Sequence, residues 1–470
     1  MAKFEELKVH SMRRIFFVIS YSLIVIGSSA QTTSQKLQKA FATFEKDSQL
    51  KHAISSLYVI DAKTGQVVFD KNSQIGLAPA STQKIITSVT AFELLGKDYR
   101  YKTEFGTCID YEKSVCFWIN PSGDPTLGSW RWESTKEKIL MDSIINGIKK
   151  SGSKIEGVVL SKIRWNFEQT PDGWIWQDIG NYYGAGAGKL NWKENQYDLI
   201  MKSGKQTGDE VIIVRTEPKL YSYNLQSQVT SAAKGSGDNS YIYIPSTNSD
   251  AIVRGTIPVG EDEFKISGAI IDPANQFIET ITDSFKNKFK WTLKEPFIMD
   301  TTLFRTPTMF YTYYSPTLDS IVYWFNKKSI NLYGEALIKT FAYEKKGFGS
   351  TDSGVVVVKK FWKEKGIDED EIGIVDGSGL SPLNRVTTHS QVEILKYAKT
   401  KDWFPYFYNS LPEYNGMSMK SGTIRGVKGF CGYHKAKNGK EYIFSFLVNN
   451  YNGSSSSLVN KMYKVLDILK

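Results

Sequence analysis

A Pro-containing turn followed directly by an apolar helical run is the segment that most constrains this chain. Ala78-Pro79-Ala80 precedes Ser81-Thr82-Gln83-Lys84, and the run from Ile85 to Leu95 is mostly apolar. Residues i and i+3 share one face of a helix, so we expect the Ser81 hydroxyl and the Lys84 amine to lie within reach of each other. Such a pair is a candidate serine nucleophile with a lysine base. In the alternative interpretation, Ser81 caps the helix and Lys84 is a solvated charge.

The Ser-x-x-Lys pattern alone does not select between these two interpretations. The same pattern occurs at three other places in the chain: Ser48/Lys51, Ser151/Lys154 and Ser231/Lys234. None of the three opens an amphipathic helix after a Pro-containing turn. Support for the catalytic interpretation must therefore come from other motifs.

The first 30 residues have the organisation of a secretory signal peptide. Arg13 and Arg14 precede an apolar run from Ile15 to Gly27, and Ser28-Ser29-Ala30 offers small residues for cleavage before Gln31. Because the run is too short to span a bilayer comfortably, we favour export over an uncleaved anchor and expect a periplasmic protein.

The remaining chain is long and basic. The full chain of 470 residues carries a net charge of +10 and suggests two or three domains, and removal of residues 1–30 leaves a net charge of +8. No block rich in lysine and arginine stands out, and no nucleic-acid-binding motif is present, so nucleic acid is not an expected partner. Dispersed positive charge is compatible with peripheral association with a membrane or with the cell wall.

Export places the three cysteines in an oxidising compartment. Cys108 and Cys116 flank a predicted hairpin turn, where they either pair across the strands or remain thiols, and Cys431 is expected to be a buried apolar side chain. No cysteine and histidine grouping has metal-ligand spacing, so no metal or other cofactor is expected. Three histidines follow the signal segment, none in a Ser-His-Asp context, which favours lysine as the base: His52, His389 and His434.

The hydrophobic pattern predicts strands near both ends of the chain with helices between them. Residues 98–295 have a different residue pattern, with short predicted strands, Gly-containing turns and many aromatic side chains. This pattern indicates an inserted β-rich segment. The predicted helices span residues 35–47, 85–95, 318–326, 332–343 and 456–469, and the predicted strands span residues 57–61, 67–70, 426–434 and 442–448. This order favours an α+β fold in which both chain ends share one antiparallel sheet that is covered by helices.

Three further motifs follow the Ser81 tetrad in order. Ser329-Ile330-Asn331 lies between two predicted helices, Asp376-Gly377-Ser378-Gly379-Leu380-Ser381 follows, and Lys420-Ser421-Gly422-Thr423 enters the C-terminal strand pair. Short decoys occur elsewhere, at Ser222-x-Asn224, Ser246-x-Asn248, Lys63-Thr64-Gly65, Lys150-Ser151-Gly152 and Lys202-Ser203-Gly204. Order and setting distinguish the first set from the decoys. For the glycine-rich Asp376 segment, a tight turn is the main interpretation and a supporting role near the site is the second.

An ordered set of Ser-x-x-Lys, Ser-x-Asn and Lys-Thr/Ser-Gly is typical of penicillin-binding proteins and class A β-lactamases. The chain resembles the D-alanyl-D-alanine carboxypeptidase/endopeptidases of the low-molecular-mass class C penicillin-binding proteins. Supporting motifs extend over most of the chain: Gly123-Asp124-Pro125-Thr126-Leu127, Gly180-Asn181-Tyr182-Tyr183-Gly184-Ala185 and Gly426-Val427-Lys428-Gly429-Phe430-Cys431-Gly432-Tyr433.

This resemblance implies a serine β-lactamase/DD-peptidase-like domain, also called transpeptidase-like, with two β-rich domains inserted between the first and second motifs. The expected boundaries are a signal peptide at 1–30, a catalytic domain at 31–97 and 296–470, a second domain at 98–194 and 256–295, and a third domain at 195–255. Peptidoglycan stem peptides are the implied substrate, and β-lactams are the implied covalent inhibitors.

The resemblance also implies a role for each motif residue. Ser81 would be the nucleophile, Lys84 its base, and Ser329 the relay that delivers a proton to the leaving D-alanine. Asn331 would hold Lys84 and a substrate amide, while Lys420, Ser421, Gly422 and Thr423 would bind the terminal carboxylate. The backbone N–H groups of Ser81 and Thr423 would form the oxyanion hole. The family commonly has an arginine at the position of Pro382. Any contact made by that arginine therefore has no counterpart in this chain.

Two rival functions remain at this point. A β-lactamase would share the acylation apparatus but would deacylate quickly, and the long insertion argues against it. A wall-binding scaffold with a decayed site is the second rival, although nothing in the motifs looks decayed. The motifs do not choose between carboxypeptidase and endopeptidase action.

Overall fold

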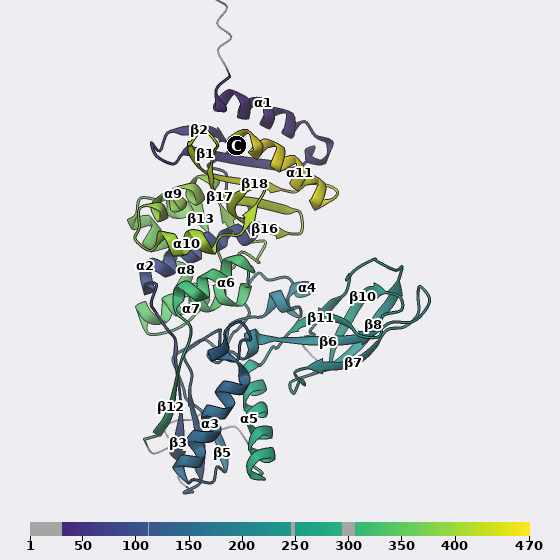
Figure 1. Cartoon of the computed structure of the whole chain (residues 1–470), viewed down its shortest axis with the longest axis vertical. Helices are drawn as coiled ribbons and strands as arrows, with labels where there is room; N and C mark the ends of the chain where they lie inside the picture. Colours follow the sequence, from purple (N-terminus) through teal and green to yellow (C-terminus); the bar gives the residue numbers. More distant parts are fainter. Residues whose placement is uncertain (1–30, 111, 246–249, 294–305) are drawn as a thin grey trace, which may run out of the picture.

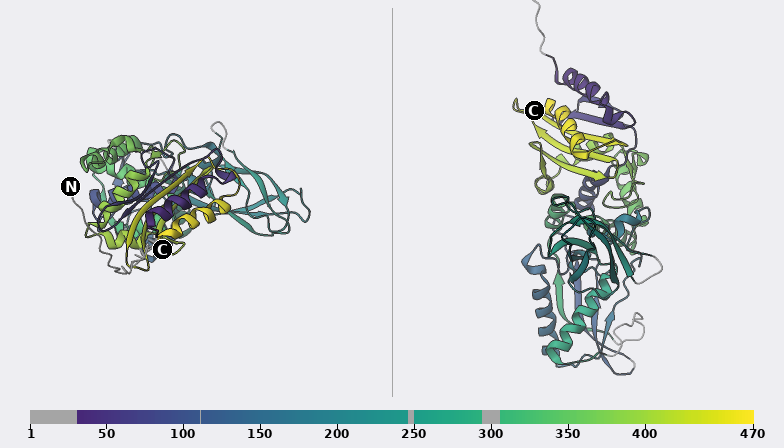
Figure 2. Two further views of the ribbon diagram at one scale, coloured as in Figure 1. Left: turned by 90° about the horizontal axis from the view of Figure 1, so that it is seen from above. Right: turned by 90° about the vertical axis from the view of Figure 1, so that its right-hand side faces the viewer.

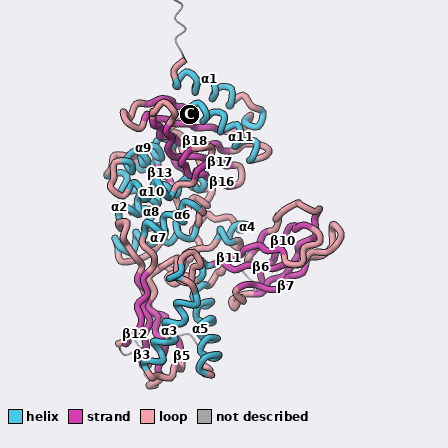
Figure 3. The backbone as a smooth tube through the Cα atoms, in the orientation of Figure 1, coloured by secondary structure: helices cyan, strands magenta, loops and turns pink. Residues whose placement is uncertain are grey.

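The computed structural model describes residues 31–110, 112–245, 250–293 and 306–470. Figures 1 and 2 show an elongated molecule, with the chain ends in a sheet and helices at one pole and a second sheet with two long helices at the other. A further β-rich unit projects to one side between them (Figure 3). The predicted signal peptide lies outside the described residues. Within the described part, no helix is long and apolar enough to cross a membrane.

A six-stranded antiparallel sheet joins the two ends of the chain, as the sequence predicts. Its strand order is β15-β16-β17-β18-β1-β2, and β1 pairs with β18 from Ile54↔Asn449 to Asp61↔Tyr442. The strands are β1 (Ile54–Asp61), β2 (Val67–Lys71), β15 (Glu413–Tyr414), β16 (Met417–Ile424), β17 (Val427–Lys435) and β18 (Glu441–Asn449). The central strands are buried on both faces because helices cover each side.

Two terminal helices cover one face of this sheet. α1 (Thr33–Glu45) and α11 (Ser455–Leu466) lie side by side across the strands (Figure 2). Their apolar stripes share one core with the sheet, where Leu37 and Phe41 of α1 meet Leu458 and Met462 of α11. Burial of these stripes is what stabilises the two ends of the chain against each other.

A helical layer covers the other face. The Ser81, Ser329 and Asp376 motifs lie in this layer or in its connections, whereas the Lys420 motif lies on β16. The layer consists of α2 (Lys84–Leu95), α6 (Leu318–Lys327), α7 (Asn331–Lys346), α8 (Thr351–Glu364), α9 (Thr388–Lys399) and α10 (Phe404–Ser410), with the short pair β13 (Ile372–Gly373) and β14 (Arg385–Val386). Residues Lys84 to Phe92 of α2 are all buried, so this helix is surrounded by protein on every side. A helix buried on every side is apolar all round, which explains the mostly apolar run in the sequence.

The polypeptide after α2 leaves this layer and forms a four-stranded sheet with order β12-β3-β4-β5. The strands β3 (Lys102–Ile109), β4 (Val115–Asn120), β5 (Gly157–Leu160) and β12 (Thr308–Tyr314) pack with α3 (Glu137–Ser151) and α5 (Pro273–Phe289). β12 pairs with β3, so this strand shares a sheet with the expected second domain although it follows the sequence-based boundary at residue 296. The sequence misses it because strand pairing is decided by partners far apart in the chain.

The laterally projecting unit contains two three-stranded sheets, ordered β11-β6-β7 and β8-β10-β9. Its strands are β6 (Gln196–Lys202), β7 (Ile212–Glu217), β8 (Asn224–Ala232), β9 (Tyr241–Tyr243), β10 (Asp250–Pro258) and β11 (Phe264–Ala269). β11 pairs with β6 although the sequence-based boundaries place residues 256–295 and 195–255 in different domains. The last part of the expected second domain therefore shares a sheet with the expected third domain.

Cys108 and Cys116 are cross-strand partners in the β3–β4 pair, which confirms the predicted hairpin. Both side chains are buried thiols, and no disulfide joins them in this structure. Cys431 is also a buried thiol, in β17, as expected of a small apolar side chain.

Candidate functional site

Ser81 and Lys84 meet at the junction of a 3-10 turn and α2. Ser81 lies in the turn η2 (Ala80–Gln83), and the α-helix begins at Lys84, the last residue of the tetrad and one residue before the predicted start at 85. The expected proximity is nevertheless present, because Lys84 Nζ lies 2.9 Å from Ser81 Oγ. Ala80 has a left-handed backbone (φ 47°), which turns the chain sharply just before Ser81.

Lys84 is completely buried and contacts two carbonyl oxygens. Its Nζ donates to Asn331 Oδ1 at 2.7 Å and to the backbone oxygen of Ser378 at 2.7 Å. Burial lowers the pKa of Lys84 well below its usual value, and the nearby charge of Lys420 lowers it further, against an opposing effect of Asp376 and Glu335. The amine is therefore held toward its neutral form.

This arrangement orients the neutral amine. An uncharged amine has two N–H groups and one lone pair, and a carbonyl oxygen can only accept hydrogen bonds. With the two N–H groups donated to Asn331 and Ser378, the lone pair of Lys84 is left facing the Ser81 hydroxyl. The site thus holds a serine hydroxyl with a correctly directed base.

A second lysine, Lys420, contacts Ser329, the serine of the Ser-x-Asn motif. Lys420 Nζ donates to Ser329 Oγ at 3.0 Å and to the backbone oxygen of Ser421 at 2.9 Å. Burial, with a smaller effect of Lys428, lowers the pKa of Lys420 to about 7. Ser329 lies in the connection between α6 and α7 with a left-handed backbone (φ 56°), a conformation that costs energy for a residue with a side chain and is typical of functional positions.

Strand β16 brings the third motif against the Ser81 turn. A side chain at Gly422 would place a Cβ 2.5 Å from Pro79 O and 3.0 Å from Ser81 N, so only glycine allows this approach. Thr423 is exposed beside it, and Lys428 Nζ donates to its hydroxyl oxygen at 2.7 Å. The third motif therefore reaches Ser81 by direct contact of two backbones.

The Asp376 segment is a tight turn and also part of the site. The Asp376 carboxylate accepts hydrogen bonds from five N–H groups, which close the turn: those of Gln83, Trp174, Gly379, Ser381 and Asn384. The same turn presents the Ser378 carbonyl to Lys84. Sequence reasoning missed this contact because a backbone carbonyl leaves no signature in residue type.

Ser81 opens into a cavity of about 750 Å³ that also receives Ser329, Asn331 and Thr423. Tyr182 and Tyr183 of the motif at 180–185 also line this cavity. Three further lining residues from the insertion (residues 98–295) were not singled out in the sequence: Arg131, Asp178 and Gln196. Asn331 Nδ2 donates to the backbone oxygen of Tyr183 at 2.7 Å, so the insertion contacts the second motif directly. Burial raises the pKa of Asp178, whose carboxylate accepts from the Tyr183 hydroxyl.

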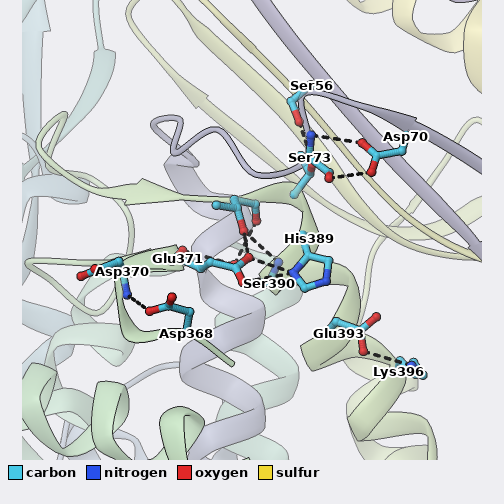
Figure 4. Close-up of polar contacts among 12 residues, drawn as sticks. Ser56, Asp70, Ser73, Asp368, Asp370, Glu371, His389, Ser390, Glu393 and Lys396 are labelled. Atoms are coloured by element: carbon cyan, nitrogen blue, oxygen red, sulfur yellow. Dashed lines mark hydrogen bonds and ion pairs between the residues drawn. The ribbon is translucent and has the colours of Figure 1, made fainter. Parts of the chain in front are cut away.

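Two other features could be mistaken for the site. A larger cleft of about 1050 Å³, bordered by residues of α3 and β6, contains none of the predicted site residues. His389 contacts Glu371 through Nδ1 at 2.9 Å (Figure 4), and its pKa is raised by that carboxylate. His389 does not line the Ser81 cavity, and the described residues place no hydroxyl on its Nε2, so this pair belongs to the start of α9.

The described residues contain no group of three or more histidine, cysteine or carboxylate side chains that could hold a metal ion. The reacting groups that the motifs bring together are the side chains of Ser81, Lys84, Ser329 and Lys420. A buried lysine directed at a serine hydroxyl defines the class of serine acyl-transfer enzymes with a lysine base.

Comparison with known proteins places the chain within that class. Residues 37–413 match the D-Ala-D-Ala carboxypeptidase 3 (S13) family, so the chain belongs to this family of serine peptidases. It is 24% identical over 468 residues to a D-alanyl-D-alanine carboxypeptidase of an Actinomadura species, covering 91% of this chain and 83% of the relative. The D-alanyl-D-alanine carboxypeptidase DacB of Haemophilus influenzae is 23% identical over 414 residues, covering 82% and 83% of the two chains.

The fold agrees with a solved structure. The crystal structure of penicillin binding protein 4 from Haemophilus influenzae superposes with a TM-score of 0.76 at 18% identity, covering 93% of this chain and 99% of the other. This similarity confirms the predicted α+β fold of serine DD-peptidases. The chain is accordingly a serine-type D-Ala-D-Ala peptidase.

Gly422 provides a test of the site geometry. We expect Gly422→Ala to lower the rate of D-alanine release from a D-Ala-D-Ala peptide by about 10- to 100-fold, because the added Cβ displaces β16 from Ser81. Gly76→Ala is the matched control, since its Cβ would meet only ordinary contacts. Equal activity of the Gly422→Ala variant and the native protein, with both folded by circular dichroism, would contradict the proposed approach.

Proposed function

We propose that this protein cleaves peptides ending in D-Ala-D-Ala through an acyl intermediate on Ser81. The observation that carries the proposal is the position of Lys84 Nζ, 2.9 Å from Ser81 Oγ and 2.7 Å from each of the carbonyl oxygens of Asn331 and Ser378. In the neutral amine, donation to the two carbonyls leaves the lone pair for Ser81. In this mechanism the Ser81 proton passes to Lys84 Nζ as Ser81 Oγ bonds to the substrate carbonyl carbon.

The remaining motif residues have complementary tasks in this proposal. The backbone N–H groups of Ser81 and Thr423 stabilise the oxyanion, an effect of about 3 kcal/mol per donor. The C–N bond then breaks as the carbonyl re-forms, and Ser329, which is hydrogen-bonded to Lys420, delivers its hydroxyl proton to the departing D-alanine. The proton that Lys84 took from Ser81 restores the Ser329 hydroxyl and leaves Lys84 neutral. Attack by water on the acyl-Ser81 ester releases the shortened peptide and restores the hydroxyl.

The substrate carboxylate would bind among the cations of the third motif. Lys420, with Ser421, Gly422 and Thr423, would hold the terminal carboxylate of D-alanine. Lys428 donates to the Thr423 oxygen, and a hydroxyl that accepts from an ammonium is free to donate its own proton. Thr423 is thereby prepared to donate a hydrogen bond to an anion in the cavity.

The insertion supports action on extended peptides as well as on simple ones. The cavity continues from Ser81 toward residues of the insertion, including Asp178, Tyr182 and Gln196. A cavity of this size has room for more than the two terminal residues. We therefore propose both carboxypeptidase action on stem peptides and endopeptidase action on cross-linked ones, with β-lactams as covalent inhibitors at Ser81.

We further propose that the protein works in the periplasm. The support is the basic, then apolar, then small-residue order of residues 1–30 and the peptidoglycan substrate of the proposed reaction. The positive net charge is compatible with peripheral association with the membrane or with the cell wall.

Acylation of Ser81 is the direct test of the mechanism. Protein without residues 1–30 should bind labelled penicillin covalently at Ser81, and Ser81→Ala should abolish both the label and the release of D-alanine. Lys84→Met keeps the Ser81 hydroxyl but removes its base, so this variant should be labelled much more slowly than the native protein. The native protein should also convert defined monomeric and cross-linked peptidoglycan fragments to products that mass spectrometry identifies.

The two rival functions predict different results in these assays. Rapid turnover of a chromogenic β-lactam, without stable labelling, would support a β-lactamase. Binding of peptidoglycan by the Ser81→Ala variant, with no D-alanine released by the native protein, would support a scaffold.

The two lysines predict a bell-shaped dependence of activity on pH. Lys84 must be neutral to act as a base, so activity falls as pH drops below its lowered pKa. Lys420 must be protonated to bind the carboxylate, so activity falls as pH rises through its pKa of about 7. Because guanidinium stays charged, Lys420→Arg should move the alkaline limb upward by more than about 1 pH unit. An unchanged alkaline limb in initial-rate profiles would exclude Lys420 as its source.

The export proposal has its own test. The protein expressed with its first 30 residues should be recovered from the periplasmic fraction with Gln31 at its N-terminus. Val25→Arg, which interrupts the apolar run, should leave the chain unprocessed in the cytoplasm, while Val25→Ile should be processed as the native protein is. A native protein that keeps residues 1–30 in every fraction would contradict the proposal.

A further inference from the structure

A second buried carboxyl lies beside the proposed base and has no task in the mechanism above. Glu335 is on α7, one helical turn after Asn331, and is completely buried. Its Oε2 accepts a hydrogen bond from the Gly377 amide at 3.0 Å. Glu335 therefore contacts the same segment, 376–379, that presents the Ser378 carbonyl to Lys84.

The segment is clamped between two helices. The Thr87 hydroxyl of α2 donates to Gly377 O at 2.6 Å, while Glu335 of α7 accepts from Gly377 N. A Cβ at Gly377 would lie 2.1 Å from Gly334 O, so the segment and α7 are in direct backbone contact. Both polar atoms of the Gly377 backbone are thus fixed, which sets the position of the next carbonyl, that of Ser378.

The two buried carboxyls of this region differ in their hydrogen bonds. Asp376 accepts from five N–H groups, which stabilise a negative charge, whereas Glu335 has two hydrogen-bond partners among the described residues, the Gly377 amide and the Ser378 side chain. Burial, together with the charge of Asp376, raises the pKa of Glu335 to about 8, against smaller opposing effects of Ser378, Gly377 and Lys84. This shift favours the neutral form of Glu335 at pH 7.

The charge on Glu335 matters to its neighbours. Lys84 faces Glu335 from α2, Lys339 shares α7 with it, and Asp376 faces it from the clamped segment. A negative Glu335 would raise the pKa of Lys84 and favour the protonated amine, which has no lone pair to accept the Ser81 proton. A neutral carboxyl keeps the hydrogen bond to Gly377 without this effect.

We infer that uncharged Glu335 is a positioning residue for Lys84: it holds the 376–379 segment so that the Ser378 carbonyl orients the base, without adding a second negative charge beside it. Glu335 acts through Gly377 and Ser378 and does not touch the substrate. The inference rests on the proposed function, because it assigns Lys84 as the base.

Two replacements of Glu335 separate its hydrogen bond from its charge. Glu335→Gln keeps an acceptor for Gly377 N–H and is always neutral, so we expect its rate of acylation by penicillin at pH 7 to stay within about threefold of the native rate. Glu335→Met has a similar size but no carbonyl acceptor, and we expect its acylation rate to fall by about 10- to 100-fold. Thr340→Val, which removes a buried hydroxyl elsewhere on α7, is the control for simple loss of packing and polar contacts.

The measurements are the acylation rate from pH 5 to 10 and the thermal unfolding midpoint of each variant. The acid limb of Glu335→Gln should coincide with the native limb or move to lower pH, because no negative charge can form beside Lys84. If Glu335→Gln loses as much activity as Glu335→Met, a charged Glu335 is required and the inference is wrong. If Glu335→Met keeps the native rate, or loses no more than Thr340→Val at the same stability, positioning is excluded.

Failure of this inference differs from failure of the proposed function. If penicillin does not label Ser81 in the native protein, the proposed function fails, whatever the variants do. If the native protein is labelled at Ser81 and the Glu335 variants give one of the two excluding results, the inference alone fails.

Discussion

Burial of the Lys84 amine is the constraint on which the rest of the site depends. A protonated amine at a fully buried position costs several kcal/mol in lost hydration, so the protein holds this lysine toward the neutral form. Neutral lysine is useful as a base only if its lone pair is directed. The carbonyls of Asn331 and Ser378 provide that direction, and each comes from a different part of the chain.

Close backbone contact allows these parts to meet. Gly422 lets β16 approach the Ser81 turn, and Gly377 lets its segment touch α7. A Cβ at either position would collide with a backbone oxygen, which a rotamer change does not relieve. The glycines of the motifs therefore have a steric role: they allow the close packing in which Lys84 contacts Ser81 and Asn331 and Lys420 contacts Ser329.

The insertion is joined to the same helix by buried polar contacts. Asn331 donates to the Tyr183 carbonyl, Tyr333 donates to the Glu194 carboxylate at 2.7 Å, and Lys339 donates to the Ala187 carbonyl at 2.8 Å. All three donors are on α7, which begins at the second motif. The insertion is thus a wall of the cavity and a support for Asn331, rather than a separate lobe on a linker.

Sequence reasoning was most successful where the pattern is local. Apolar alternation and turn residues predicted the paired strands at the chain ends, which β1 and β18 confirm. The pairing of β12 with β3 across the predicted boundary at residue 296 was not visible in the sequence, because the two strands lie far apart in the chain. Sequence reasoning predicted that Ser81 and Lys84 lie on one helical face, which their distance of 2.9 Å bears out, although Ser81 lies in a 3-10 turn that precedes the α-helix.

By itself, the sequence determined the family, the order of the motifs and the residue types that the chemistry needs, because these are written as side chains at fixed spacings. The tertiary structure alone decided how Lys84 is oriented, that Ser378 contributes a backbone carbonyl, and that Glu335 lies beside the base. The reason is physical: hydrogen-bond direction and desolvation depend on which distant segments pack together, and a backbone carbonyl contributes the same group whatever its residue type.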